Sequence, residues 1–243
     1  MASSGQIVLF DLASKPPGGT WSLNPWKTRL LLNYKGLDYR TEWLEYPEIK
    51  PRLEGHLEPN TDGFPYTIPT VILPDGSYVM DSRAILDRIT ALKPTPTLPV
   101  ESPAHAWLER NYGPIMTRLR GVYMPLVPRL LLNEASVGYW AATRPQAAGM
   151  PLDELERREG GDVAWNGVAP YLKEVVTMLG ENPDGPFFAG REVGYADFWW
   201  GGLLLFMDRL GVLDELVAAS GEHGSRHRDL LEGLRPWSER CTY

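Results

Sequence analysis

The segment YTIPTVILPDGSYVMDS, residues 66–82, is the strongest indication of the fold in this chain. Its apolar runs 70–73 and 78–80 flank a Pro-Asp-Gly turn, a pattern that predicts a β-hairpin leading directly into a helix. Proline cannot donate to a strand ladder, so a proline before the first strand suits a place where the chain turns its backbone outward. If the Ile68–Pro69 bond is cis, the N–H and C=O of Ile68 can pair with an extended peptide. Ser82, at the start of the helix, would then bind the carboxylate of that peptide.

The residues before this hairpin predict alternating strands and helices. Residues 7–12 form an apolar run typical of a buried strand, and Asn24-Pro25 is typical of a helix N-cap followed by proline at the first helical position. A small mixed sheet with a βαβ unit and a ββα unit is therefore expected. The expected elements are strand 7–12, helix 26–35, strand 39–46, a weaker helix 47–57, strands 70–73 and 78–80, and helix 82–92.

A proline-rich stretch, KPTPTLP at residues 93–99, separates this half from a second, all-helical half. We place an α/β domain at residues 1–93, a stiff linker at 94–103 and an all-α domain at 104–243. Helical apolar periodicity predicts helices at 104–123, 163–179, 196–210, 214–219 and 226–234. The prolines between the first two of these helices are expected to break the chain into irregular pieces, with an exposed loop at 143–150. They are Pro125, Pro128, Pro145 and Pro151.

Composition and charge narrow the range of functions. A net charge of −7, with acidic and basic residues mixed throughout, argues against nucleic-acid binding. No run approaches the roughly 18 apolar residues that a membrane span needs, and residues 1–6 lack the basic start of a secretory signal. The single cysteine, Cys241, cannot form an intrachain disulfide, so a cytoplasmic location is expected. The four histidines form no ligand set, so we expect no metal.

Two further motifs, together with the hairpin, link the chain to a known family. WSLNPWKTR at residues 21–29 and GREVGYAD at residues 190–197 accompany the Ile-Pro and Asp-Ser pairs of the hairpin region. The chain as a whole resembles the glutathione transferases, and the string 21–29 resembles the fungal Fu A class, which is related to the bacterial lignin β-aryl etherases. The resemblance implies a thioredoxin-like, glutathione-binding domain with a mixed four-stranded sheet, followed by the all-α domain. Asp197 matches the family's capping aspartate of a buried helix, whose N-cap in this chain is Gly194.

Ser22 matches the catalytic serine of the family and precedes the first predicted helix. An ordinary thiol titrates near pH 8.5, and lowering its pKa by about two units requires roughly 2.7 kcal/mol in favour of the thiolate. A hydroxyl hydrogen bond to charged sulfur contributes about 1.5–3 kcal/mol and a helix N-terminus about 0.3–1 kcal/mol, so a single serine is sufficient. Ser14, at the end of the first strand, is the competing candidate, and the Asn24 amide could also donate to the sulfur. Helix capping is the alternative role for Ser22 and for Asn24.

The resemblance also assigns the residues that bind glutathione and the second substrate. Asp81 would hold the γ-glutamyl ammonium group and Ser82 the neighbouring carboxylate, although helix capping also explains this pair. Lys27 or Lys50 could reach the glycyl carboxylate, or either could be solvated. The expected glutathione-binding residues are Ile68, Pro69, Asp81, Ser82, Asn24 and Lys50. The expected substrate pocket is an apolar stripe at helical spacing that could equally belong to the core: Trp107, Tyr112, Met116 and Tyr123.

The sequence thus predicts a cytoplasmic, homodimeric glutathione transferase of etherase-like type. Its cosubstrate would be glutathione, and its other partners would be hydrophobic aromatic electrophiles or aryl ethers, as in detoxification; the resemblance implies a fungal source. No cysteine lies near Ser22, which disfavours thiol transfer through a mixed disulfide. The alternative is a weakly catalytic or non-catalytic binding protein, a ligandin, that uses the same cleft to sequester polyphenols and other aromatic compounds.

Overall fold

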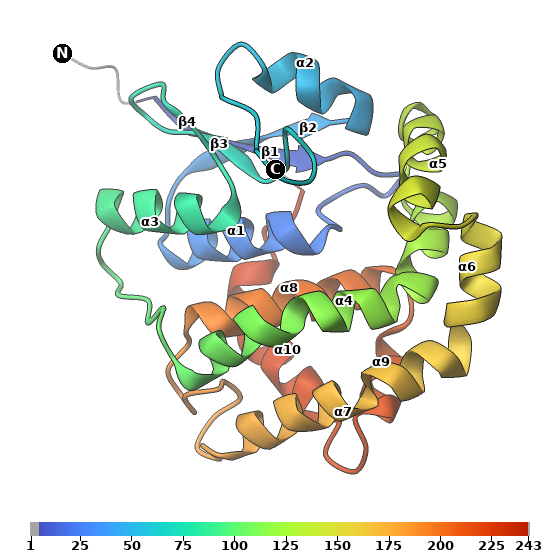
Figure 1. Ribbon diagram of the computed structural model, residues 1–243. Coiled ribbons are helices and arrows are strands. Elements are labelled where there is room, and N and C mark those ends of the chain that lie inside the picture. The colour runs from blue at the N-terminus through green and yellow to red at the C-terminus, as the bar shows by residue number, and fades with distance from the viewer. Residues whose placement is uncertain (1–4, 243) are drawn as a thin grey trace.

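A four-stranded mixed sheet in the order β2-β1-β3-β4 forms the first half of the molecule (Figure 1). The computed structural model describes residues 5–242. β1 pairs in parallel with β2 and antiparallel with β3, and β3 pairs antiparallel with β4. All six residues of β1 are buried, as expected of a central strand. The strands are β1 (Ile7–Leu12), β2 (Tyr39–Leu44), β3 (Thr70–Ile72) and β4 (Tyr78–Met80).

The helices of this half follow the predicted order with changed boundaries. The hairpin and the helix after it are confirmed, and α3 begins and ends where predicted. The first helix begins at Leu23 instead of residue 26, and the weak helix predicted at 47–57 is a short 3-10 turn followed by a single short α-helix. The elements are α1 (Leu23–Tyr34), η1 (Tyr46–Glu48), α2 (Ile49–Leu53) and α3 (Ser82–Leu92).

The second half is built from helices, as predicted. Figure 1 shows the long helix α4 running below the sheet-containing half, with α7 and α10 beneath it. Within residues 5–242, no helix combines the length and the apolar character required to cross a membrane. The helices are α4 (Pro103–Leu130), α5 (Glu134–Ala148), α6 (Leu152–Glu159), α7 (Gly161–Gly180), α8 (Tyr195–Arg209), α9 (Leu213–Ala219) and α10 (Arg226–Ser238). The domain boundaries at residues 93 and 103 stay a prediction.

The prolines of the middle region do not break it, so this part of the prediction is wrong. α4 continues through Pro125 and Pro128, and residues 143–148 belong to α5 instead of an exposed loop. α4 is held by close packing on the end of α6: a Cβ atom at Gly121 would lie 2.4 Å from the backbone carbon of Glu159. Next to this contact the Arg120 guanidinium forms a bidentate ion pair with Glu159, with both N···O distances 2.6 Å. Tertiary packing therefore overrides the local helix-breaking tendency of proline.

The two halves meet where α8 crosses α1. A Cβ atom at Gly202 of α8 would lie 2.8 Å from the carbonyl oxygen of Leu23, so glycine is required for this approach. The start of α8 is fixed by its predicted cap: Gly194 is the N-cap, and Asp197 accepts hydrogen bonds from the N–H groups of Gly194 (2.7 Å) and Phe188 (2.9 Å). The N-terminus of α1 thus packs directly on the buried helix α8.

Candidate functional site

Two adjoining cavities open beside the start of α1. The larger has a volume of about 570 Å³ and the smaller about 440 Å³, and three residues, Asn24, Thr67 and Ile68, line both. The larger cavity is bounded by the end of β1, η1, α2, the loop before β3, and α5. The smaller one is bounded by α1, the same loop and the start of α3. A ligand that occupies the smaller cavity can therefore reach into the larger one along residues 67–68.

Ser22 lines the larger cavity at the N-terminus of α1. It is the N-cap residue, with φ −77° and ψ 135°, but among the described residues its side chain makes no capping hydrogen bond. The prediction that Asn24 caps this helix is wrong, because α1 begins at Leu23 and Asn24 lies exposed in its first turn. The Ser22 hydroxyl is therefore available to a ligand, next to backbone N–H groups that carry the positive end of the helix dipole.

Ser14, the competing serine, is engaged elsewhere. Its hydroxyl donates a hydrogen bond to the carbonyl oxygen of Gly19 (3.3 Å), and Ser14 lines neither cavity in the described part of the chain. The Trp21 indole N–H donates to the carbonyl oxygen of Ala13 (3.3 Å) across the same loop. These two hydrogen bonds, from Ser14 and Trp21, therefore hold the loop that precedes Ser22 in place.

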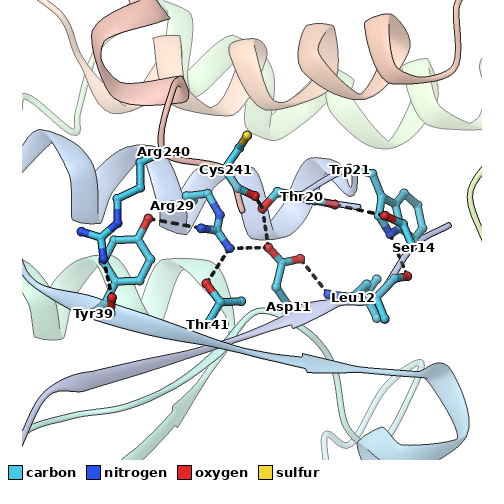
Figure 2. A network of polar contacts seen from close by, with 12 residues as sticks. Asp11, Leu12, Ser14, Thr20, Trp21, Arg29, Tyr39, Thr41, Arg240 and Cys241 are labelled. Atoms are coloured by element: carbon cyan, nitrogen blue, oxygen red, sulfur yellow. Dashed lines mark hydrogen bonds and ion pairs between the residues drawn. The ribbon is translucent and has the colours of Figure 1, made fainter. Parts of the chain in front are cut away.

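A buried network of polar contacts links this loop to β1 and α1 (Figure 2). Asp11 and Arg29 form an ion pair of 3.0 Å with both side chains fully buried, and the Thr20 hydroxyl donates to the Asp11 carboxylate at 2.7 Å. Burial raises the pKa of Asp11, and the Arg29 guanidinium and the Thr20 hydroxyl oppose this shift. The Thr20 N–H donates to the carbonyl oxygen of Cys241 (2.9 Å), so the C-terminal segment is tied to the same loop.

The cis peptide bond considered for Ile68–Pro69 is confirmed. Ile68 lines both cavities, and within residues 5–242 its backbone N–H and C=O have no hydrogen-bond partner. The Thr67 N–H faces the Met80 sulfur at 3.2 Å, and the Thr70 hydroxyl donates to the Thr67 carbonyl at 2.9 Å, which fixes the turn. An unpaired N–H and C=O beside a cavity is the arrangement that an extended peptide can pair with.

Asp81 and Ser82 lie together in the smaller cavity, at the N-terminus of α3. Asp81 has φ +80°, the sole positive value among the described non-glycine residues, and such a conformation is strained and common at ligand sites. One of its carboxylate oxygens accepts from the N–H groups of Arg83 (2.8 Å) and Ala84 (3.3 Å), so Asp81 caps α3 and keeps its other oxygen for a ligand. Burial raises the pKa of Tyr195, the residue from α8 beside Ser82, to about 12.

Lys27, one of the two lysines considered, is buried in the smaller cavity and not solvated. It is 7% exposed, and its ammonium lies over the rings of Trp199 (5.1 Å) and Tyr112 (6.0 Å). Burial lowers the pKa of Lys27 to about 8, and the negative charge of Asp81 partly opposes the shift. Lys50 differs: it lines the larger cavity, its side chain is 71% exposed, and it lies 3.9 Å from Glu54. The buried cation of the smaller cavity is therefore Lys27.

The wall of the larger cavity is aromatic. Tyr46 of η1 and Tyr139 of α5 stack with ring centroids 5.6 Å apart, and Phe64 and Tyr66 come from the loop before β3. The Arg144 guanidinium, from α5, lies among these rings. Burial raises the pKa of Tyr46 to about 12, so this phenol stays neutral near pH 7. This wall was not predicted, because the prolines around residues 134–148 were expected to break the chain into irregular pieces and α5 was not foreseen.

The apolar stripe of α4 is partly buried and packs against the hydrophobic core. Among residues 5–242, none of its four members lines either cavity. Tyr112 packs on Trp199 and Tyr123 on Phe206, both of α8. Trp107 packs on Tyr171 of α7, and Met116 contacts the hydrophobic core. The assignment of Trp107, Tyr112, Met116 and Tyr123 to the substrate pocket stays a prediction, and the aromatic wall of the larger cavity comes from η1, α5 and the loop before β3.

Comparison with known families gives matches over both halves of the chain. The model of the glutathione S-transferase N-terminal domain matches residues 21–100, and that of the C-terminal domain matches residues 105–237. Among curated proteins, the glutathione S-transferase-like protein ustS of Aspergillus flavus is 31% identical over 212 residues, covering 79% of this chain and 76% of that protein.

Solved structures give the same assignment. Glutathione transferase GSTFuA3 from Phanerochaete chrysosporium is similar with a TM-score of 0.83 and 25% identity, covering 97% of this chain and 98% of that one. Glutathione S-transferase CsGST63524 of Ceriporiopsis subvermispora, solved in complex with glutathione, is similar with a TM-score of 0.79 and 25% identity, covering 96% and 98% of the two chains.

Proposed function

Because the chain belongs to the glutathione transferase family, we propose that it is a serine-type enzyme that activates glutathione through Ser22. Its second substrates would be hydrophobic aromatic electrophiles or aryl ethers. The observation that carries the proposal is the position of the Ser22 hydroxyl, which makes no capping hydrogen bond within residues 5–242 and lines the aromatic cavity that adjoins a polar one. The expected homodimer and cytoplasmic location stay predictions.

The smaller cavity fits the chemistry of glutathione, a tripeptide with one ammonium and two carboxylate groups. Ile68 offers an unpaired N–H and C=O to the backbone of an extended peptide. Ser82 and the N-terminus of α3 offer hydrogen-bond donors to a carboxylate, and the free oxygen of Asp81 suits an ammonium group. Lys27 adds a buried positive charge at the same place. The ligand's thiol would then point toward the larger cavity.

Bound glutathione supplies a thiol that reacts as its thiolate. Ser22 would stabilise that thiolate by donating a hydrogen bond, which contributes about 1.5–3 kcal/mol when the acceptor is charged. The N-terminus of α1 adds about 0.3–1 kcal/mol. Together these terms match the roughly 2.7 kcal/mol that a pKa shift of two units requires. Tyr46, which lines the larger cavity, has a pKa raised to about 12, so its phenol would line the pocket in the neutral form and would not act as a base near pH 7.

The aromatic wall supports an aromatic second substrate. Flat ligands gain both apolar burial and ring stacking against Tyr46, Tyr139 and Phe64. The volume of about 570 Å³ also supports the ligandin alternative, in which aromatic compounds are held without reaction.

The test compares Ser22→Ala with Ser14→Ala as the matched control. For the native protein we expect glutathione-dependent turnover of 1-chloro-2,4-dinitrobenzene. For Ser22→Ala we expect the pKa of bound glutathione, followed by thiolate absorbance, to rise by about one to two units, because about 1.5–3 kcal/mol of thiolate stabilisation is lost. Turnover should fall at pH 7 and recover at higher pH, with glutathione affinity retained. Unchanged activity in Ser22→Ala would refute the role of Ser22, and aromatic binding without turnover in the native protein would favour the ligandin.

A further inference from the structure

The charged residues that line the larger cavity are opposite in sign to the net charge of the protein. The protein carries a net charge of −7, but the charged residues lining this cavity, within the described part of the chain, are two cations, Arg144 and Lys50, and no carboxylate. A cavity of one sign in a protein of the opposite sign concentrates ligands of complementary charge. The lining therefore favours an anion over a neutral or cationic ligand.

Arg144 is the cation held inside this cavity. Its guanidinium carbon lies 5.1 Å from the ring centroid of Tyr46, 4.7 Å from that of Phe64 and 4.3 Å from that of Trp140. One guanidinium nitrogen donates to the Thr143 hydroxyl at 2.9 Å. No carboxylate of residues 5–242 lies within salt-bridge distance of Arg144, whereas Lys50 lies 3.9 Å from Glu54. Arg144 also hydrogen-bonds with Tyr46, and its guanidinium, held among three rings, keeps a positive charge and further N–H donors for a ligand.

The aromatic rings and the cation belong to one surface. Tyr46, Tyr139 and Phe64 line the cavity together with Arg144, and Ser22 lines it as well. A flat ring stacked on this wall can therefore place an acidic substituent at Arg144 while another of its carbons faces the sulfur beside Ser22. Arginine presents parallel N–H groups that match the two oxygens of a carboxylate, which makes this pairing directional.

We infer that the second substrate of this site is an aromatic electrophile that bears a carboxylate, and that Arg144 selects it by binding that group. The inference rests on the proposed transferase function and assigns Arg144 as its specificity-determining residue. Lys50, exposed at the edge of the same cavity, adds to the positive field.

The test uses two substrates that differ at a single substituent, the anionic 4-chloro-3-nitrobenzoate and its neutral methyl ester. In both, the thiolate sulfur forms a bond to the ring carbon that carries chlorine, and chloride leaves with the electron pair of the broken bond. The thiol proton passes to solvent when the thiolate forms. The carboxylate lies opposite the chlorine on the ring, which separates the group that would bind Arg144 from the reacting carbon. The measured quantity is the ratio of kcat/KM for the acid to kcat/KM for the ester, which cancels any general loss of activity.

For the native protein we expect this ratio to exceed that of the uncatalysed reaction. We expect Arg144→Gln to lower it about tenfold, the effect of losing one charge-assisted hydrogen-bonded pair, and Arg144→Lys to lower it less because the charge remains. Arg110→Gln, at an exposed position of α4, is the control and should leave the ratio unchanged. Thermal unfolding of each variant checks that it is folded.

Failure of the inference and failure of the transferase proposal give different results. If the native protein converts both substrates and Arg144→Gln leaves the ratio unchanged, the specificity role of Arg144 is refuted and the transferase proposal stands. If the native protein converts neither substrate, the transferase proposal fails, and calorimetric binding of 4-nitrobenzoate and its methyl ester decides the role of Arg144. A preference for the acid that disappears in Arg144→Gln would sustain that role, and equal binding of the two ligands would overturn it.

Discussion

Replacing Lys27 with methionine should stabilise the protein near neutral pH. Lys27 is 7% exposed and burial lowers its pKa from 10.5 to about 8. A shift of about 2.5 units corresponds to roughly 3 kcal/mol of destabilisation by the buried charge, with the partial offset from Asp81 already included. Methionine fills a similar volume without that charge and can pack on the Trp199 and Tyr112 rings. We therefore expect Lys27→Met to gain about 3 kcal/mol in free energy of unfolding at pH 7.

The sign of the pH dependence follows from proton binding. In the unfolded chain Lys27 keeps its proton up to about pH 10.5, whereas in the folded protein it loses the proton near pH 8. Between these values the unfolded state binds more protons, so native stability rises with pH. Below pH 8 both states are protonated and the full penalty is present. The advantage of Lys27→Met should therefore fall to roughly 1–1.5 kcal/mol at pH 9.5.

Urea unfolding of the native protein and of Lys27→Met at pH 7 and pH 9.5 measures this difference. Lys50→Met is the matched control, because the Lys50 side chain is 71% exposed and its loss should change stability by less than about 0.5 kcal/mol. If the smaller cavity binds glutathione, Lys27→Met should also weaken glutathione binding while it stabilises the fold. A stability loss at pH 7, or a gain that does not shrink at pH 9.5, would refute the reasoning.

Two further predictions concern the residues that hold the site in place. Thr20→Val removes the hydroxyl that donates to the buried Asp11 at 2.7 Å, so we expect the free energy of unfolding to fall by about 1–3 kcal/mol in chemical denaturation. The control is Thr117→Val at an exposed position, which should leave stability nearly unchanged. An equally small effect of Thr20→Val would contradict the prediction. Asp197→Ala leaves the N–H groups of Phe188 and Gly194 without their partner, so we expect a loss of about 2–5 kcal/mol and faster exchange of these two amides. Exposed Asp208→Ala on the same helix is the control, and equal effects of the two aspartate substitutions would count against a capping role.

Local features of this protein could be predicted because short-range chemistry fixes them. The β-hairpin at residues 70–80, the start of α3 at Ser82 and the Gly194 N-cap all depend on turn, cap and proline preferences that act over a few neighbouring residues. The cis bond before Pro69 belongs to the same class. Family membership followed from these motifs together with the string 21–29.

The predictions that failed depended on contacts between residues distant in sequence. Pro125 was expected to end α4, but packing of Gly121 on α6 holds the helix through it. For the α4 stripe the sequence left a pocket and a core position open, and in the fold Tyr112 and Tyr123 pack on Trp199 and Phe206 of α8. Helical periodicity shows that one face of a helix is buried and does not show which element buries it.

Short-range sequence patterns were enough to predict the hairpin, the helical second half and Ser22 as the candidate hydroxyl. The three-dimensional fold was needed to show that Lys27 is the buried cation, that Ser14 is engaged with Gly19, and that Arg144 lies in the cavity beside Ser22. The reason is that turns and caps are set by neighbouring residues, whereas burial, pKa shifts and cavity walls are set by the elements that the fold brings against each side chain.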